Sequence, residues 1–344
     1  MKKLWVGLLV VFVLTSVVSA QDGLFTLYGT DPVVDNGTSI EWDSPYTDPG
    51  AVFFYDGKFH MFRNGFKGWP TSVQIGYLTS DDGLNWTEVS EDPVMRTRDV
   101  PYAGIAALAS DGMVLDDGTW VLYFYTWETR DGLKGPAAIG RATAPAPTGP
   151  WTPDPAPILT AGSEGSWDAG MVAAPRIVQT DDGYNMYYTG YLPEGIGTGK
   201  IGLATSEDGI TWTKYDDPAT TDALYAESDP VLTAPAGIDD LAQAMVEITP
   251  DGWTMIFRQA DFTTGDGNGA MTLNYALSED GIHWTIADTE PFWSADTVPG
   301  ANSFWYTAME YHDDTYYLYI ETGIGPKTKI FAATHEGSLT GMEM

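Results

Sequence analysis

Cysteine is absent from the 344-residue chain, and histidine is rare, with four residues. The lack of thiols excludes a disulfide scaffold, a cysteine nucleophile and a thiolate metal site. The histidines lie too far apart in the sequence to form a zinc-binding pattern. Basic side chains are also scarce: 16 lysines and arginines stand against 48 aspartates and glutamates, a formal net charge of −32 at pH 7. A surface of this charge repels phosphate, so we expect no nucleic acid partner.

Long apolar runs are missing after the N-terminus. There, Lys2 and Lys3 precede an apolar run from Leu4 to Val18, and small residues follow before Gln21. This layout is typical of a secretory signal peptide; the alternative, an uncleaved membrane anchor, is disfavoured because the run is short for a span. We therefore expect residues 1–20 to be removed. The mature protein, residues 21–344, should be secreted to the extracellular space or periplasm as a monomer without a membrane span.

Five copies of one short pattern organise the mature chain. Each copy is a turn residue followed by alternating aromatic and apolar residues, and the copies begin at Gly57, Gly118, Gly183, Gly252 and Thr315. In three repeats a turn of the form Ser-x-Asp-Gly-x-x-Trp follows, ending at Trp86, Trp212 and Trp284. Each repeat has room for about four short strands, and none shows a long helical period. The sequence thus predicts an all-β, five-bladed β-propeller of four-stranded antiparallel blades; a β-sandwich would not need five copies.

The two ends of the chain predict how the ring closes. The chain stops before the fifth repeat reaches its outer strand. Near the N-terminus, Phe25-Thr26 precedes Asp31-Pro32 with the same spacing that separates Trp86-Thr87 from Asp92-Pro93. We therefore predict that residues 25–28 supply the missing outer strand, pairing with residues 330–334, which removes a bare sheet edge and makes residues 21–344 one domain.

The repeats resemble those of five-bladed glycoside hydrolases. The Asp-Gly turn ending in tryptophan is similar to a turn of the arabinanase/β-xylosidase, invertase/levanase and mannoside-phosphorylase families, and the likeness covers nearly the whole mature chain. Residues 48–62, beginning Asp48-Pro49-Gly50, resemble the opening catalytic strand of invertase-like enzymes. The resemblance implies a propeller that acts on carbohydrate, with Asp48 as nucleophile or general base.

Other positions depart from the families' pattern. Ala173-Ala174 stands before Pro175, where the resembled families carry acidic residues. The fourth repeat reads Gln243-Ala-Met-Val-Glu247, again without a glutamate at the usual position. Asp111 lies close to where arabinanase-like enzymes place an aspartate that tunes a pKa. The partner carboxyl must therefore come from another position if the protein is an enzyme.

The acids that enter the innermost strands are the candidates for that partner. Glycoside hydrolysis needs one carboxyl that donates a proton and one that acts as base or nucleophile. We expect Asp168 or Asp240 to supply the acid beside Asp48, and Asp111 and Glu247 to contact substrate. Glu247 and Glu310 fall deeper along their strands, so polar contacts between blades are the alternative role for these two.

Tryptophan is abundant, with 13 residues. Six tryptophans belong to the repeated pattern, and we expect them to pack between blades: Trp86, Trp120, Trp151, Trp212, Trp253 and Trp284. Six others lie in segments between strands, where flat rings can stack on sugars or pack at the rim: Trp42, Trp69, Trp127, Trp167, Trp293 and Trp305. Of these, Trp42, Trp167 and Trp305 are the predicted sugar contacts.

No metal site can be assigned from the sequence, and no cofactor is required, because phosphate loops and dinucleotide fingerprints are missing. A bound Ca²⁺ stays open because carboxylate oxygens are plentiful.

Two functional hypotheses follow. The first is a secreted glycoside hydrolase acting on oligo- or polysaccharide, favoured by the Asp48 motif. The second is a catalytically silent propeller that binds glycan or protein, favoured by Ala173-Ala174. A structural envelope protein, suggested by the extreme charge, is a third hypothesis.

Overall fold

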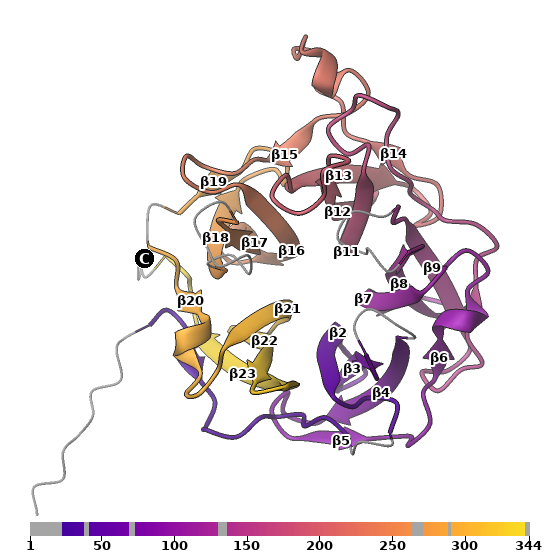
Figure 1. Cartoon of the computed structure of the whole chain (residues 1–344), viewed down its shortest axis with the longest axis vertical. Coiled ribbons are helices and arrows are strands. Elements are labelled where there is room, and N and C mark those ends of the chain that lie inside the picture. Colours follow the sequence, from indigo (N-terminus) through magenta and orange to yellow (C-terminus); the bar gives the residue numbers. More distant parts are fainter. Residues whose placement is uncertain are drawn as a thin grey trace, which may run out of the picture.

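The described residues form five β-sheets arranged in a ring around a central axis (Figure 1). This arrangement confirms the predicted five-bladed, all-β propeller. The structure, a computed structural model, describes residues 23–37, 41–68, 73–129, 136–262, 271–287 and 290–340. The expected signal peptide and Trp69 lie outside these residues.

Each blade begins with the strand nearest the axis. These innermost strands are β2 (Tyr46–Tyr55), β7 (Ala106–Val114), β11 (Met171–Thr180), β16 (Asp240–Thr249) and β21 (Ser303–His312). A hairpin connects each to a second strand that carries the repeated aromatic pattern: β3 (Lys58–Phe66), β8 (Trp120–Trp127), β12 (Gly183–Tyr191), β17 (Gly252–Ala260) and β22 (Thr315–Ile324). Aromatic and β-branched side chains fit the pleated, packed surface of a strand. In β8, accordingly, every residue is buried.

Two further strands complete each blade toward the rim. The third strands are β4 (Gln74–Ser80), β9 (Ile139–Ala144), β13 (Lys200–Ser206), β18 (Thr272–Ser278) and β23 (Lys327–Glu336). The outer strands are β5 (Trp86–Glu88), β10 (Thr152–Pro153), β14 (Thr213–Lys214), β19 (Thr285–Ile286) and, in the fifth blade, β1 (Thr26–Leu27). Short strands β6 (Met95–Arg96), β15 (Pro230–Leu232) and β20 (Trp293–Ser294) also pair with third strands. Single 3-10 turns cover Thr97–Asp99, Ala223–Tyr225 and Ala295–Thr297.

The N-terminal strand closes the ring as predicted. Strand β1 pairs antiparallel with β23, with Thr26 opposite Thr334 and Leu27 opposite Ala333. The fifth blade is therefore built from both ends of the described chain, in the order β1-β23-β22-β21. Because the last blade takes its outer strand from the first described residues, the fifth blade cannot form completely without that N-terminal segment.

The three Ser-x-Asp-Gly-x-x-Trp turns fasten neighbouring blades. Each glycine carbonyl accepts a hydrogen bond from a tyrosine hydroxyl of the preceding blade in the ring. The pairs are Tyr319–Gly83 at 2.8 Å, Tyr123–Gly209 at 3.1 Å and Tyr187–Gly281 at 2.7 Å. The tryptophan of each turn packs edge-on against the same tyrosine ring. The predicted packing of these tryptophans between blades is thus confirmed for Trp86, Trp212 and Trp284.

No helix among the described residues is long and apolar enough to cross a membrane.

Candidate functional site

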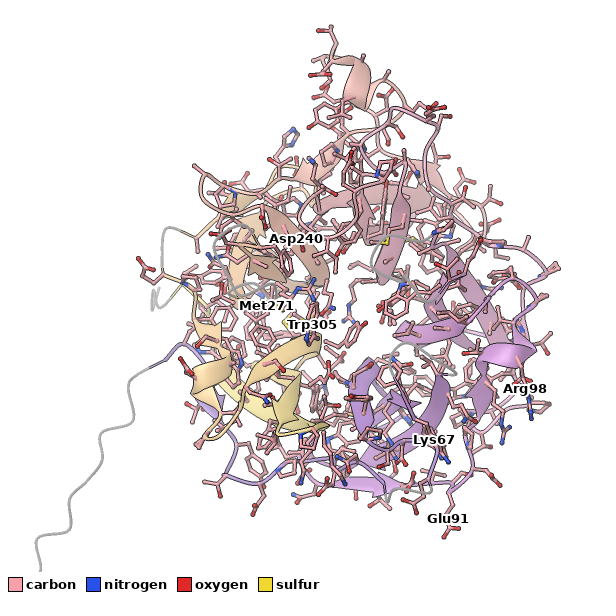
Figure 2. The ribbon with its side chains drawn as sticks, in the orientation of Figure 1. Lys67, Glu91, Arg98, Asp240, Met271 and Trp305 are labelled. Carbon is pink, nitrogen blue, oxygen red and sulfur yellow. The ribbon has the colours of Figure 1, made fainter. Side chains whose placement is uncertain are left out.

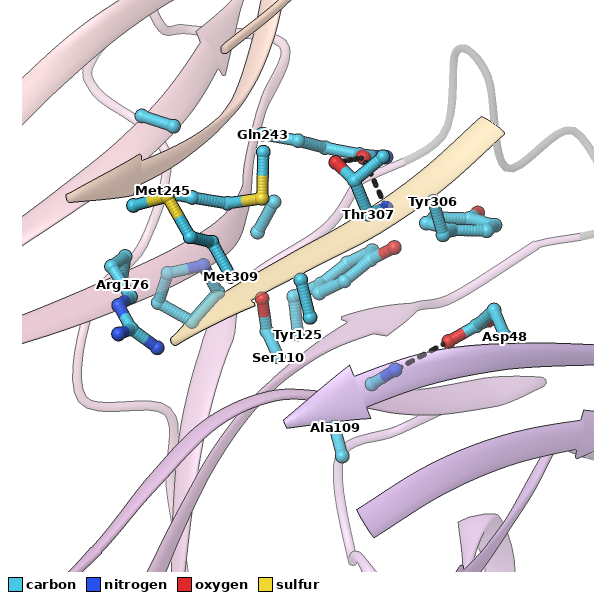
Figure 3. Close-up of a pocket in the computed structure, with 15 residues that line it drawn as sticks. Asp48, Ala109, Ser110, Tyr125, Arg176, Gln243, Met245, Tyr306, Thr307 and Met309 are labelled. Atoms are coloured by element: carbon cyan, nitrogen blue, oxygen red, sulfur yellow. Dashed lines mark hydrogen bonds between the residues drawn. The ribbon is translucent and has the colours of Figure 1, made fainter. Parts of the chain in front are cut away.

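A small pocket lies where the five innermost strands converge (Figure 3). Each of these strands interrupts its pairing with the second strand by a β-bulge, and the bulges follow Asp48, Ala109, Ala173, Ala242 and Phe304. A bulge redirects the side chains beside it. Residues at or just after the bulges line the pocket, which we call the axial pocket.

Asp48 is the acidic residue of this pocket. Its side chain is buried, and Oδ1 accepts hydrogen bonds from the backbone N–H of Gly50 at 2.9 Å and from Nδ2 of Asn64 at 2.7 Å. Oδ2 is buried without a hydrogen-bond partner among the described residues. Burial raises the pKa of Asp48 to about 7, against the opposing effect of these two hydrogen bonds. The carboxyl therefore titrates near neutral pH with one oxygen unoccupied.

The sequence around Asp48 fixes this geometry. Gly50 has φ +57°, and a Cβ there would lie 2.0 Å from the carbonyl oxygen of Phe62. Only glycine fits this close approach. Asn64 also bonds the backbone of Ala109 in the neighbouring blade, accepting from its N–H at 2.8 Å and donating to its carbonyl at 2.9 Å. Asp48 is thus held between two blades rather than on a free loop.

Two tyrosines and a glutamate lie close enough to Asp48 to feel its charge. Tyr125 and Tyr306 line the pocket, and their side chains hydrogen bond to each other. Glu321 is buried behind them, where Oε2 accepts a hydrogen bond from the N–H of Tyr306 at 3.1 Å. Burial, followed by the negative charge of Asp48, raises the pKa of Glu321 to about 8. Asp48 and Glu321 therefore influence each other's ionisation.

The deep end of the pocket holds a buried ionic cluster around Arg176. Its Nη1 lies 2.9 Å from Oδ1 of Asp111, and Nη2 pairs with Glu247 and lies 4.0 Å from Oε2 of Glu310. Glu310 also accepts the backbone N–H of Phe54 at 3.0 Å. Burial raises the pKa of all three acids, and the charge of Arg176 opposes this in each. The cluster joins the innermost strands of all five blades.

This cluster shows where Asp111 and Glu247 lie. Sequence reasoning expected both to contact substrate, with interblade contact as the alternative for Glu247. In the structure each is bound to Arg176 and neither lines the axial pocket. Arg176 itself is one of the residues that line the axial pocket. Among the described residues, no group of three or more histidine, aspartate or glutamate side chains is arranged to hold a metal ion.

Asp168 and Trp167 lie in the packed interior of blade three. Asp168 is fully buried, with Oδ2 at 2.5 Å from Nζ of Lys214 and at 3.2 Å from the hydroxyl of Tyr188. Trp167 is also fully buried, stacks on Tyr188 and donates its Nε1–H to the hydroxyl of Ser228. Neither residue lines the axial pocket or the mouth pocket described below.

Asp240 and Trp305 lie on the inner side of the ring (Figure 2). Asp240 is fully buried: Oδ1 accepts the N–H groups of Gly197 and Gly199, and Oδ2 lies 3.6 Å from Nη2 of Arg258. The guanidinium of Arg258 lies 5.5 Å from the ring centroid of Trp305. Asp240 therefore orients Arg258, which in turn supports the ring of Trp305.

Trp305 borders a second small pocket that adjoins the axial pocket, and we call it the mouth pocket. The two pockets share four lining residues, namely Tyr125, Ala174, Gln243 and Tyr306. Trp127, Tyr191 and Arg258 add to the wall of the mouth pocket. Together the pockets offer aromatic rings, hydroxyls and an amide, which is the chemistry of a site for a polar ring-shaped ligand.

Trp42, the remaining predicted sugar contact, lies away from both pockets. The guanidinium of Arg63 lies 5.1 Å from its ring centroid, and its Nε1 donates to the carbonyl of Glu91. Arg63 is in turn bound to Asp43, with Nη1 at 2.6 Å from Oδ2. Of the acids and tryptophans predicted for the site, the structure brings Asp48 and Trp305 to the pockets.

Gln243 and the tyrosine pair were not predicted as site residues. Gln243 has φ +54°, a strained backbone for a residue other than glycine. Its Oε1 accepts from the N–H of Thr307 at 3.2 Å (Figure 3), so its amide NH₂ remains as a donor.

Glu321 was not predicted as a site residue either. The sequence signal that could have identified it is a charged residue within the mostly aromatic and apolar pattern of β22.

No protein-family model matches the sequence, and no curated protein matches it significantly. Solved structures do match. One comes from work stating that the GH130 family of mannoside phosphorylases contains glycoside hydrolases that target β-1,2 mannosidic linkages in Candida mannan; it has 20% identity, TM-score 0.66, and covers 91% of this chain and 94% of that chain. A glycosyl hydrolase from Bacteroides ovatus has 19% identity, TM-score 0.65, and coverages of 91% and 94%. A GH43_1 enzyme from Xanthomonas citri has 15% identity, TM-score 0.59, and coverages of 91% and 92%.

These similarities concern the fold. Five-bladed β-propeller glycoside hydrolases are structural neighbours of nearly the whole chain at low sequence identity.

Proposed function

We propose that the protein cleaves glycosidic bonds in the axial pocket and that Asp48 is its proton-exchange group. The observation that carries the proposal is the free, buried Oδ2 of a carboxyl whose pKa is raised to about 7. Proton transfer in catalysis is most effective when the pKa of the group lies near the working pH. The glycosidase-like fold and the aromatic mouth pocket support carbohydrate as the substrate class.

Glycosidases ordinarily divide acid and base roles between two carboxyls; with Asp48 alone at the pockets, the proposal departs from that rule and has Asp48 act in both steps. Protonated Asp48 gives its proton to the glycosidic oxygen, and the bond from that oxygen to the anomeric carbon breaks. The carboxylate then takes a proton from the water that bonds to the anomeric carbon, which restores the acid. Water enters on the side that the leaving group vacated, because the same carboxyl serves both steps, so the anomeric configuration should be retained.

The surrounding charges suit the transition state of this reaction. Glycosidic cleavage passes through a species with positive charge at the anomeric carbon. Fixed negative groups aimed at developing positive charge lower the barrier without reorganising. Asp48 after proton donation supplies such a group, and the amide NH₂ of Gln243 and the hydroxyls of Tyr125 and Tyr306 can bind sugar hydroxyls.

A second candidate function is glycan binding without turnover. The observation that favours it is that Asp48 is the one carboxyl among the described residues lining either pocket. Asp168 and Asp240, the predicted partners, are bound to Lys214 and Arg258. A propeller that binds glycan without cleaving it would also need the aromatic side chains of the mouth pocket and the polar side chains of the axial pocket.

One screen distinguishes the two functions. Residues 21–344 are incubated with aryl-glycosides and with plant, fructan and mannan polysaccharides, and both hydrolysis and binding are recorded. Asp48→Asn should abolish hydrolysis and keep binding, whereas Asp116→Asn, at an exposed hairpin tip, should change neither. Binding without hydrolysis by the unaltered protein supports the second function. Hydrolysis that survives in Asp48→Asn contradicts the role of Asp48.

A further inference from the structure

A second hollow lies on the face of the ring opposite the axial pocket. It is lined by residues of blades three and four and measures about 740 Å³, much more than the axial pocket. The axial pocket is at the bulge after Ala173, whereas this hollow begins at Thr180, the last residue of the same strand. Arg176, the last residue of this strand that lines the axial pocket, lies four residues before Thr180, which is roughly 13 Å of extended strand. The two sites are thus at opposite ends of the innermost strands; we call the second one the rear groove.

The rear groove is polar, and its charged groups are all acidic. Its lining residues are Thr180, Asp182, Tyr184, Asn185, Thr205, Ser206, Glu207, Asp208, Thr211, Thr213, Trp253 and Asp280. Hydroxyl, amide and carboxylate groups are arranged around two aromatic rings. No lysine or arginine belongs to this described lining, so phosphate, sulfate and uronate groups would meet repulsion there.

Two of the carboxylates are fixed in position by repeat turns. Asp208 accepts the N–H groups of Ile210 at 2.8 Å and Thr211 at 2.7 Å, and Asp280 accepts those of Ile282 and His283 in the same way. These hydrogen bonds lower the pKa of both aspartates. Both groups therefore remain ionised acceptors for sugar hydroxyls, and their positions are set by the backbone.

The two rings rest on the glycines of the same two turns. A Cβ at Gly281 would lie 3.0 Å from the indole of Trp253, and one at Gly209 would lie 3.7 Å from the ring of Tyr184. Trp253 also packs edge-on against Tyr187, with ring centroids 6.3 Å apart. Both rings are half-buried, so they are held on one side by protein while they border the groove on the other. Rigid rings of this kind bind ligands at a small cost in conformational entropy.

We propose that the rear groove binds an uncharged glycan chain, independently of the axial pocket. Its ring faces suit the apolar faces of sugars, and its acceptors and donors suit their hydroxyls. Its size exceeds that of the axial pocket, which fits a chain of several sugar units. A basic peptide would satisfy the carboxylates alone and leave the hydroxyls and the rings unexplained.

The chain offers a closely matched pair of variants for the test. Thr213 in blade three and Thr87 in blade one are both exposed and occupy equivalent positions in the outer strands of their blades. Thr213 pairs with Thr205, and Thr87 pairs with Thr79. Only Thr213 lines the rear groove. Thr213→Arg should fill the groove and bind its carboxylates, while Thr87→Arg adds the same side chain to blade one. Trp253→Ala tests the ring directly, with its melting temperature recorded because the indole also packs between blades.

The measurement is retention in native gels that contain soluble β-mannan, arabinan or arabinoxylan, with polygalacturonate and a polylysine peptide as charged comparisons. All variants carry Asp48→Asn, so that no polysaccharide is degraded. The proposal predicts retention by at least one neutral polysaccharide, at least tenfold weaker in Thr213→Arg and unchanged in Thr87→Arg. It is overturned if no neutral polysaccharide is retained, if Thr213→Arg binds as well as Thr87→Arg, or if only polygalacturonate or polylysine binds. Hydrolysis is measured separately with the protein that retains Asp48. The proposal for the axial pocket and the proposal for the rear groove can therefore be contradicted independently.

Discussion

Blades one and three share a framework and differ in the residue that precedes the bulge of the innermost strand. In both, a Trp-Asp pair enters the blade, and its aspartate is buried against a cation: Asp43 lies 2.6 Å from Arg63, and Asp168 lies 2.5 Å from Lys214. Both innermost strands then bulge after the next aligned residue, which is Asp48 in blade one and Ala173 in blade three. The aspartate that recurs in both blades, Asp43 or Asp168, is paired with a cation. Asp48, which has no counterpart in blade three, is not paired with a cation and borders the axial pocket.

This difference separates two uses of the same residue type. An aspartate repeated in equivalent positions stabilises the blade, since each copy has its own buried cation. Asp48 has no cation among its hydrogen-bond partners, and burial raises its pKa to about 7. Keeping an unpaired carboxyl buried lowers stability when it ionises, so a chain that retains one at a pocket points to chemistry there.

Asp48→Asn should produce the largest effect on activity. The asparagine carbonyl can accept the same bonds from Gly50 and Asn64, but the amide cannot exchange a proton. We expect kcat to fall by about 10³-fold, within the range for losing a general acid–base group, while the melting temperature at pH 6 stays the same. Initial rates on the best substrate of the screen, with melting curves, provide the check. A kcat within tenfold of that of the unaltered protein would contradict a catalytic role for Asp48 and so the functional difference between blades one and three.

Asp168→Asn should produce the largest effect on stability. It leaves Lys214 as an uncompensated buried charge, and breaking such a pair costs about 3–5 kcal/mol. Activity per folded molecule should be unchanged because Asp168 lies outside the pockets. Urea unfolding and active-site titration measure the two quantities. Loss of activity with unaltered stability would instead assign Asp168 to catalysis.

Raising the pH should destabilise the protein. Asp48 has a pKa of about 7 in the fold against 3.8 for the free side chain, and Glu321 about 8 against 4.5. The folded state therefore holds more protons than the unfolded state between these limits, and stability falls as pH rises through them. From pH 5 to pH 7 Asp48 alone should account for roughly 2 kcal/mol. Urea unfolding at pH 5, 7 and 8 should show this fall, and it should be shallower in Asp48→Asn; equal slopes would contradict the pKa of Asp48.

Placing an acid in blade three should produce the smallest effect. Ala173→Asp puts an unpaired carboxyl at the aligned bulge, opposite Thr189 rather than an asparagine. A buried polar group without a partner costs about 1–3 kcal/mol. We expect the melting temperature to drop more at pH 8 than at pH 5, and Thr189→Asn to restore part of the loss, as Asn64 supports Asp48. Equal melting at both pH values would show that this bulge is solvated.

The repeats made the fold predictable. Five copies of the aromatic strand pattern determined the number of blades, and the position of Phe25 relative to Asp31 predicted ring closure by β1. Both inferences depend on local spacing, which the sequence shows directly. The likeness at residues 48–62 also led to Asp48, which the structure places at the axial pocket.

The partners of the other acids could not be read in the same way. Asp168 meets Lys214 across 46 positions, and Asp111 meets Arg176 across 65 positions and two blades. Spacing along one strand does not reveal a cation that arrives from another. For the same reason, Glu321 was overlooked: it lies in a second strand, and its proximity to Asp48 arises only when β1 and β23 close the fifth blade against the first.

The ionisation of Asp48 tests the central claim most directly. Protein labelled with ¹³C at aspartate Cγ is titrated by NMR between pH 4 and pH 9, and the signal missing from Asp48→Asn identifies the residue. The account predicts a midpoint near pH 7, well above the other assigned aspartates. A midpoint below about 4.5 would mean that the carboxyl is ionised and solvated like an ordinary surface acid, and would contradict Asp48 as the proton-exchange group.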